Sequence, residues 1–117
     1  MRMTALAFAL SALLVSVAPA MADDLQIKVV SVTSVVAPRG SIKLVVQTEP
    51  SATCDGNVHW QFKQGVGDYS LRQKTAGDDG MIDWTWAAPQ NAAKGTIGIN
   101  CSAGDKSGKT STSVEVR

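Results

Sequence analysis

The sequence is poor in the residues that most protein chemistry requires. It has one histidine, two cysteines, three tryptophans, one tyrosine and two phenylalanines. A Ser-His-Asp triad or a His/Cys metal site could use only His59, so we expect no catalytic residue, no metal site and no cofactor. The acidic residues Asp78, Asp79 and Asp83 lack the spacing of a calcium loop, and residues 77–80 are instead typical of a turn. The sequence therefore predicts a protein that is not an enzyme.

An excess of one charge is also lacking. The chain has 11 Lys and Arg against 10 Asp and Glu, and no run of one sign. Nucleic acid binding requires a basic surface that neutralises phosphates, and anionic membranes favour the same feature. We therefore expect no nucleic acid partner.

Only one long apolar run is present, from residue 5 to residue 18. It follows Arg2 and precedes Ala20-Met21-Ala22, whose small residues are typical of a signal-peptidase site. We predict a signal peptide over residues 1–22 and one domain over residues 23–117, periplasmic or secreted. The alternative is an uncleaved anchor helix, for which the run is short. After cleavage no membrane span is expected.

The two cysteines, Cys54 and Cys101, form the natural pair in such an exported chain. An oxidising compartment and an even cysteine count favour one disulfide. On the chain-entropy model this bridge contributes roughly 4 kcal/mol to stability. The rival, a thiolate metal site or nucleophile, lacks a CxxC pair and further histidines.

The segment 81–86 shows the clearest strand pattern. Ile82, Trp84 and Trp86 fall on one face, and Asp83 and Thr85 fall on the other. Because each aromatic ring can bury on the order of 200 Å², we expect this strand to be the spine of the core.

The same alternation recurs along the chain, and no helical period follows residue 22. Six or seven short strands separated by turns predict an all-β, antiparallel β-sandwich. Residues 64–69 and 89–95 are expected to be loops, and residues 70–75 a short edge strand. The phase shift at Val29 and Val30 predicts a bulge or a change of sheet, with Val30 and Val32 inward. The predicted core comprises Trp60, Ile82, Trp84, Trp86, Ile97 and Ile99.

Several segments resemble those of a known family. The stretch QTEPSATC at residues 47–54 and the WTW strand at 84–86, with residues 31–40 and 101–104, resemble bacterial immunoglobulin-like domains of secreted and surface proteins. The resemblance covers about residues 29–116 and implies an immunoglobulin-like sandwich with a binding, adhesive or spacer role. In antibody domains the first cysteine lies within the second strand. Here Cys54 follows that strand, so the disulfide is expected to staple one end of the domain.

The expected contact surface is the outer face of the third strand together with the glycine-rich loop beyond it. Loops on a rigid scaffold often carry recognition. We predict an exported binding module for a protein partner. The alternatives are a module that binds surface polysaccharide or cell wall through an exposed tryptophan, and a secreted inhibitor whose loop at 65–69 fills an enzyme cleft. The candidate contact residues are His59, Gln61, Lys63, Asp68 and Tyr69.

Overall fold

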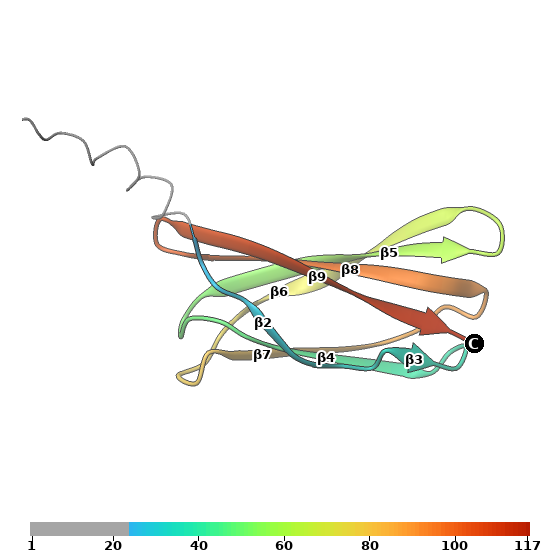
Figure 1. The fold of residues 1–117 in the computed structure, drawn as a ribbon, viewed down its shortest axis with the longest axis horizontal. Coiled ribbons are helices and arrows are strands. Elements are labelled where there is room, and N and C mark those ends of the chain that lie inside the picture. The colour runs from blue at the N-terminus through green and yellow to red at the C-terminus, as the bar shows by residue number, and fades with distance from the viewer. Residues whose placement is uncertain (1–23) are drawn as a thin grey trace, which may run out of the picture.

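The computed structural model describes residues 24–117, so the predicted signal peptide lies outside the described residues. The described chain forms two facing β-sheets (Figure 1), which confirms the all-β prediction. None of its segments is a helix long and apolar enough to cross a membrane. The strands are β2 (Lys28–Val32), β3 (Val35–Val36), β4 (Ser41–Gln47), β5 (Thr53–Phe62), β6 (Val66–Thr75), β7 (Met81–Ala87), β8 (Ala92–Ala103) and β9 (Lys106–Val116).

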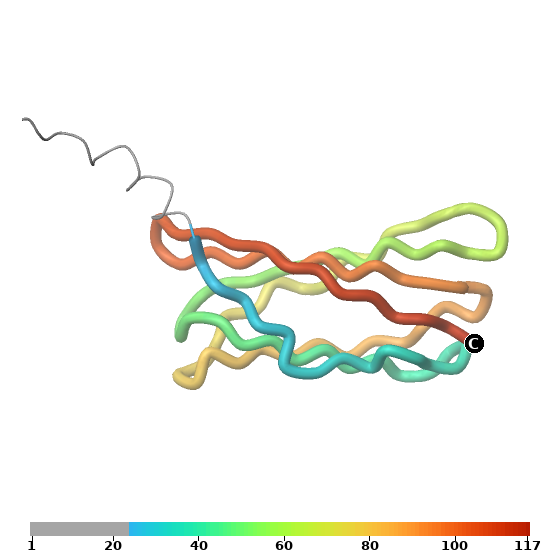
Figure 2. Tube along the Cα trace, viewed as in Figure 1, coloured from blue at the N-terminus to red at the C-terminus, as the bar shows by residue number. Residues whose placement is uncertain are grey.

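The strands divide into a three-stranded and a five-stranded sheet. The first has the order β2-β4-β7 and the second the order β3-β9-β8-β5-β6. All neighbours are antiparallel, as predicted, except β3 and β9, which run parallel. The parallel pair arises because the chain crosses from one sheet to the other between β2 and β3. In Figure 2 the N-terminal segment (blue to cyan) starts beside the beginning of β9 (red) and ends near the C-terminus.

The core lies between the two sheets and follows directly from the period-two patterns. On β4, Ile42, Leu44 and Val46 are completely buried, whereas Ser41 and Lys43 are exposed. Each buried residue of β4 lies opposite an apolar residue of β7. The six residues predicted for the core are all buried, namely Trp60, Ile82, Trp84, Trp86, Ile97 and Ile99.

The strand β7 packs its apolar face into the core as expected, although it does not lie at the centre of its sheet. This strand pairs only with β4 and is therefore an edge strand of the smaller sheet. Its two tryptophans are still buried, because their side chains point toward the opposite sheet and not along the edge. Burial of a side chain and a central place in the sheet are thus separate properties.

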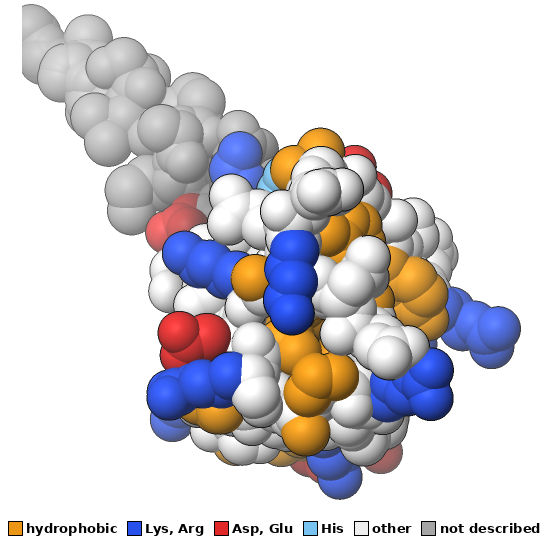
Figure 3. Space-filling model, turned by 90° about the vertical axis from the view of Figure 1, so that its right-hand side faces the viewer, with side chains coloured by type: hydrophobic (Ala, Val, Ile, Leu, Met, Phe, Trp, Pro, Cys, Tyr) orange, Lys and Arg blue, Asp and Glu red, His pale blue; other side chains and the backbone are white. Residues whose placement is uncertain are grey.

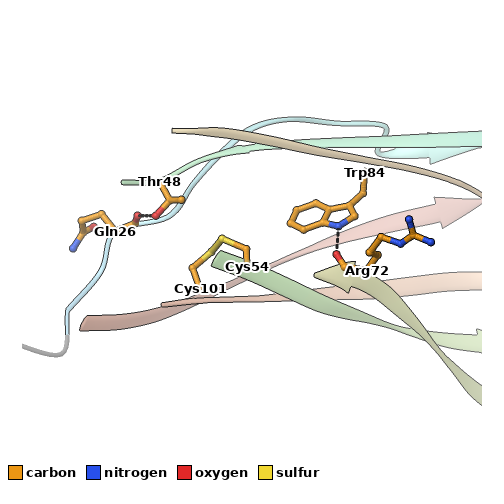
Figure 4. The surroundings of a disulfide bond; sticks show 6 residues. All are labelled: Gln26, Thr48, Cys54, Arg72, Trp84 and Cys101. Atoms are coloured by element: carbon orange, nitrogen blue, oxygen red, sulfur yellow. Dashed lines mark hydrogen bonds between the residues drawn. A yellow bond between two sulfur atoms is a disulfide. The ribbon is translucent and has the colours of Figure 1, made fainter. Parts of the chain in front are cut away.

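The predicted disulfide between Cys54 and Cys101 is present (Figure 4). It joins β5 to β8, which are neighbours in the five-stranded sheet, and the two cysteines are direct partners in the register. Cys54 is the second residue of β5, so the bridge lies toward one end of the sheet. The disulfide therefore braces one sheet and does not tie the two sheets together.

The phase shift at the start of the chain produces both predicted features. A bulge falls between Val29 and Ser31 in the pairing of β2 with β4, and the chain then changes sheet to form β3. Val32 packs against the core as expected. Val30 is 44% exposed, so the prediction that it points inward is wrong. The bulge absorbs Val30 as the extra residue and turns it to solvent.

The glycine-rich segment 64–69 was expected to be a loop, and this prediction is wrong. Phe62 and Gly65 close a tight turn, in which Gly65 has a φ of 93°, and β6 begins at Val66. In the same way β8 begins at Ala92, within the expected loop 89–95. Both segments pair with β5, one on each side of it. This pairing overrides the low strand propensity of the short, glycine-containing segments.

Candidate functional site

The outer face of the five-stranded sheet is polar along β5, β8 and β9. Since successive side chains alternate between the two faces, the residues between the buried positions all point outward. On β5 these residues include Asp55, Asn57, His59 and Gln61, each of which is exposed. We call this surface the outer face; on the other two strands it continues through Lys94, Thr96, Gly98, Asn100, Ser102, Ser107, Lys109, Ser111, Ser113 and Glu115.

A hydrogen-bonded cluster joins β5 to β6 on the outer face. His59 and Asp68 are direct partners in the register, and the distance from His59 Nδ1 to Asp68 Oδ1 is 3.0 Å. Asn57 Nδ2 donates to the same oxygen at 3.1 Å. These hydrogen bonds, first that from His59 and then that from Asn57, lower the pKa of Asp68. The cluster therefore presents an ionised carboxylate in a defined orientation.

The cluster is open to solvent. The His59 and Asp68 side chains are 47% and 61% exposed, so neither lies in a cleft that excludes water. Within residues 24–117, no three His, Cys, Asp or Glu side chains lie where they could hold a metal ion. An exposed imidazole and carboxylate on the outer face can offer hydrogen bonds and charge to a second molecule.

Two further candidate residues extend the outer face toward the β5–β6 turn. Gln61 lies opposite Lys94 of β8 and is exposed. Lys63 follows β5, and its backbone N–H donates to the carbonyl of Asn91 at 3.2 Å. Figure 3 views the right-hand end of Figure 1, to which this turn belongs; basic side chains are dispersed there among polar and apolar ones.

Tyr69 does not belong to the surface that sequence reasoning assigned to it. It lies within β6, where its register partner is Val58, a completely buried residue of the inner face. Tyr69 therefore points to the opposite side of the sheet from Asp68. It is still 49% exposed, because β6 is an edge strand. The error follows from the loop prediction, which ignored the alternation of faces.

Tyr69 instead lines a cleft between the edges β6 and β7. The cleft has a volume of about 260 Å³ and is also lined by Arg72, Lys74, Trp84 and Trp86. Two hydrogen bonds cross it: Trp84 Nε1 donates to the carbonyl of Arg72 at 2.7 Å, and Lys74 Nζ donates to the carbonyl of Asp83 at 2.6 Å. Figure 4 shows the first of these.

Trp86 differs from Trp84 although both lie on the inner face of β7. Its Nε1 is buried and has no hydrogen-bond partner in the described chain. A buried, unpaired N–H costs free energy because it loses its bond to water. The exposed fractions of Trp60, Trp84 and Trp86 are 3%, 3% and 7%, so none offers a free ring for stacking on a sugar.

A shallow hollow of about 590 Å³ lies at the disulfide end of the outer face. Residues from β5, β6, β8 and β9 meet there, and hydroxyl, amide and charged groups line it. Sequence reasoning missed this hollow because it depends on the pairing of strands that are far apart in the chain. The polar side chains around it are Thr53, Asp55, Gln73, Asn100, Ser102, Ser107 and Lys109.

Comparison with known proteins adds no family to this description. The sequence matches no protein-family model, and it matches no curated protein. The site is therefore described by its own geometry.

Proposed function

We propose that the chain is an exported immunoglobulin-like β-sandwich that binds a protein partner through its outer face and carries out no chemistry. The strand order supports the fold assignment. If β2, β4 and β7 are strands A, B and E, then β9, β8, β5 and β6 are G, F, C and C′, as in immunoglobulin-like sandwiches. Trp60 is buried on β5, where such domains place their core tryptophan.

The disulfide departs from the antibody arrangement. Antibody domains join strands B and F across the two sheets. Here the bridge joins the strands equivalent to C and F within one sheet. A disulfide in a small domain also supports export, because such bonds persist in oxidising compartments.

The observation that carries the binding role is the continuous outer face. It is polar across three strands, and the Asn57–His59–Asp68 cluster holds its groups in place before a partner arrives. Groups ordered in advance lose less conformational entropy on binding. The variety of donors, acceptors and charges suits a folded protein surface, whose rim is polar.

This proposal is tested by immobilising the protein and identifying what it captures. The wild type is exposed to two pools, one of envelope and secreted proteins and one of cell wall and polysaccharide. We expect a protein to be retained by the wild type, lost by the His59→Ala/Gln61→Ala variant, and retained by Lys43→Ala. Lys43 is an exposed residue of β4 on the other sheet, so its variant is the matched control. Equal retention by both variants would contradict the proposed surface.

The hollow favours a second candidate, the binding of a surface polysaccharide. Its hydroxyl, amide and carboxylate groups could hydrogen-bond sugar hydroxyls without an exposed tryptophan. Retention on polysaccharide alone, abolished by Asn100→Ala, would support this function over protein binding. An inhibitor acting through a loop at 65–69 is not proposed, because residues 66–69 pair with β5.

A further inference from the structure

The edge of the five-stranded sheet formed by β6 has free backbone groups. Cys54 and Cys101 lie opposite each other with a Cα–Cα distance of 4.0 Å, which is typical of a non-hydrogen-bonded antiparallel pair. By alternation, the backbone groups of Val58 point toward β6 and meet those of Tyr69. The intervening residues of β6 therefore direct their N–H and C=O groups away from the sheet; they are Val66, Asp68 and Ser70.

The other sheet edges each carry a feature that discourages pairing with another strand. The ammonium group of Lys74 occupies the carbonyl of Asp83 on β7. Both ends of β9 are covered by the N-terminal segment, and the stretch between them bears Lys109. The strand β2 is short and bulged. Charge, cover and bulges are the usual means of blocking an edge.

Residues 66–71 of β6 lack these features. The strand has no bulge before Leu71, since its register shift lies between that residue and Lys74. The one charge in this stretch, Asp68, is already held by His59 and Asn57. Val66 is 65% exposed and Tyr69 is 49% exposed, and they are two of the four exposed large apolar residues of the described chain.

We propose that β6 pairs antiparallel with β6 of a second copy of the chain, about a two-fold axis at Tyr69. In this register Asp68 of each copy lies opposite Ser70 of the other, and each such pair exchanges two backbone hydrogen bonds. The carboxylate of Asp68 then lies beside a hydroxyl group. The two five-stranded sheets join into one continuous sheet across the dimer.

The two neighbouring self-complementary registers are less favourable. Centring the axis on Asp68 would place two carboxylates directly opposite each other, which is destabilising. Centring it on Ser70 would pair Asp68 directly with Arg72, whose carbonyl already accepts from Trp84 and lies at the bulge. With the axis at Tyr69, Arg72 would meet only Val66, at the outer ends of the paired segment. The Tyr69 register instead brings together two half-exposed aromatic rings as a cross-strand pair.

Proline substitution tests this pairing because it can remove a free N–H group of β6 without removing a hydrogen bond between β6 and β5. The Ser70→Pro variant removes an N–H that points away from β5. The matched control is Ser111→Pro, which removes an outward N–H at the β9 edge of the same sheet. By analytical ultracentrifugation we expect a concentration-dependent dimer for the wild type and for Ser111→Pro, and at least a tenfold weaker dimer for Ser70→Pro. A wild type that is monomeric at millimolar concentration would overturn the proposal.

Cross-linking tests the register and does not depend on the folding of a proline variant. Under mild oxidation the Tyr69→Cys variant should give a disulfide-linked dimer, because residues 69 of the two copies face each other. Val66→Cys on the same strand should not, since it lies away from the axis. Equal cross-linking by both variants would overturn the register.

Self-pairing uses the edge of β6 and does not require a partner on the outer face. Loss of protein capture in His59→Ala/Gln61→Ala together with an intact dimer would thus separate the two proposals. A different result would overturn the proposed pairing with a second copy. If the wild type is monomeric and Ser70→Pro abolishes its capture of another protein, the edge of β6 pairs with a strand of that protein.

Discussion

The two lateral sides of the molecule are closed in different ways. On one side the N-terminal segment connects the sheets with backbone: Leu25 N–H donates to Ser107 at 2.9 Å, Thr33 N–H to Lys43 at 3.1 Å, and Glu115 N–H to Ser34 at 2.8 Å. On the other side only side chains connect β6 and β7. They are Trp84, which reaches Arg72, and Lys74, which reaches Asp83.

Both kinds of connection hold the sheets together, but they differ in how much edge backbone they leave available for pairing with another strand. A backbone connection uses the edge groups of both sheets and leaves little for another strand to pair with. A side-chain connection holds the sheets together but leaves the backbone of β6 free over residues 66–70. The side closed by side chains is therefore the one suited to association.

The largest expected effect on stability comes from removing the disulfide, which lies between the two sides. The Cys54→Ala/Cys101→Ala variant should lose about 4 kcal/mol of unfolding free energy, because the unfolded chain regains the freedom of a loop 47 residues long. Urea unfolding of the variant and of the reduced wild type measures this. If neither shows a lower midpoint, the bridge contributes nothing to stability.

The next effect contrasts the two tryptophans of the open side. The Trp84→Phe variant removes the bond across the cleft and leaves the Arg72 carbonyl unpaired, whereas Trp86→Phe removes an N–H that has no partner. We expect Trp84→Phe to be the more destabilising by about 1–3 kcal/mol. Denaturant unfolding of both variants gives this difference directly, and equal losses would show that the Trp84 bond has no net value.

On the covered side, Gly108→Ala should detach the N-terminal segment. A Cβ atom at Gly108 would clash with the carbonyl oxygen of Leu25, so the segment must move. We expect a loss of about 1–3 kcal/mol, as for other overpacked sites. The control is Gly98→Ala, where an added Cβ meets nothing within 4 Å. Hydrogen exchange at the Leu25 amide should accelerate only in the first variant.

The smallest effect concerns the exposed cluster on the outer face. Since its pKa is lowered in the folded state, Asp68 stabilises the protein above the pKa of the unfolded state, and this contribution is lost as the pH falls through the folded pKa. The His59→Ala variant should raise the pKa of Asp68, as followed by NMR titration of its carboxyl carbon. An unchanged pKa would mean that the hydrogen bond does not persist in solution.

The inner faces could be predicted because they depend on local patterns. Alternation in β4 and β7 identifies the buried residues without knowledge of their neighbours, and the even number of cysteines together with the predicted signal peptide indicates the disulfide. The position of β7 at an edge could not be predicted, since sheet order is decided by pairing between distant segments. Burial of Trp84 is the same in either position.

The candidate site was predictable only in part, for a related reason. His59 and Gln61 lie on a strand with clear alternation, so their outward direction follows from sequence. The neighbouring glycines predict a loop for Asp68 and Tyr69, which is wrong. Their faces depend on the tight turn at Gly65, which sets the register of β6 against β5. A register error of one residue exchanges the two faces.

The parallel arrangement of the N-terminal segment and β9 has a mechanical consequence. Asp24 lies beside Ser107 at the start of β9, and Val36 lies beside Val116 at its end. Residues 24 and 117 therefore emerge at opposite ends of the molecule (Figure 1). A force that pulls these two residues apart acts along the strands and loads their hydrogen bonds together, in shear. Such a domain should resist tension far better than one whose terminal strands are peeled apart one bond at a time.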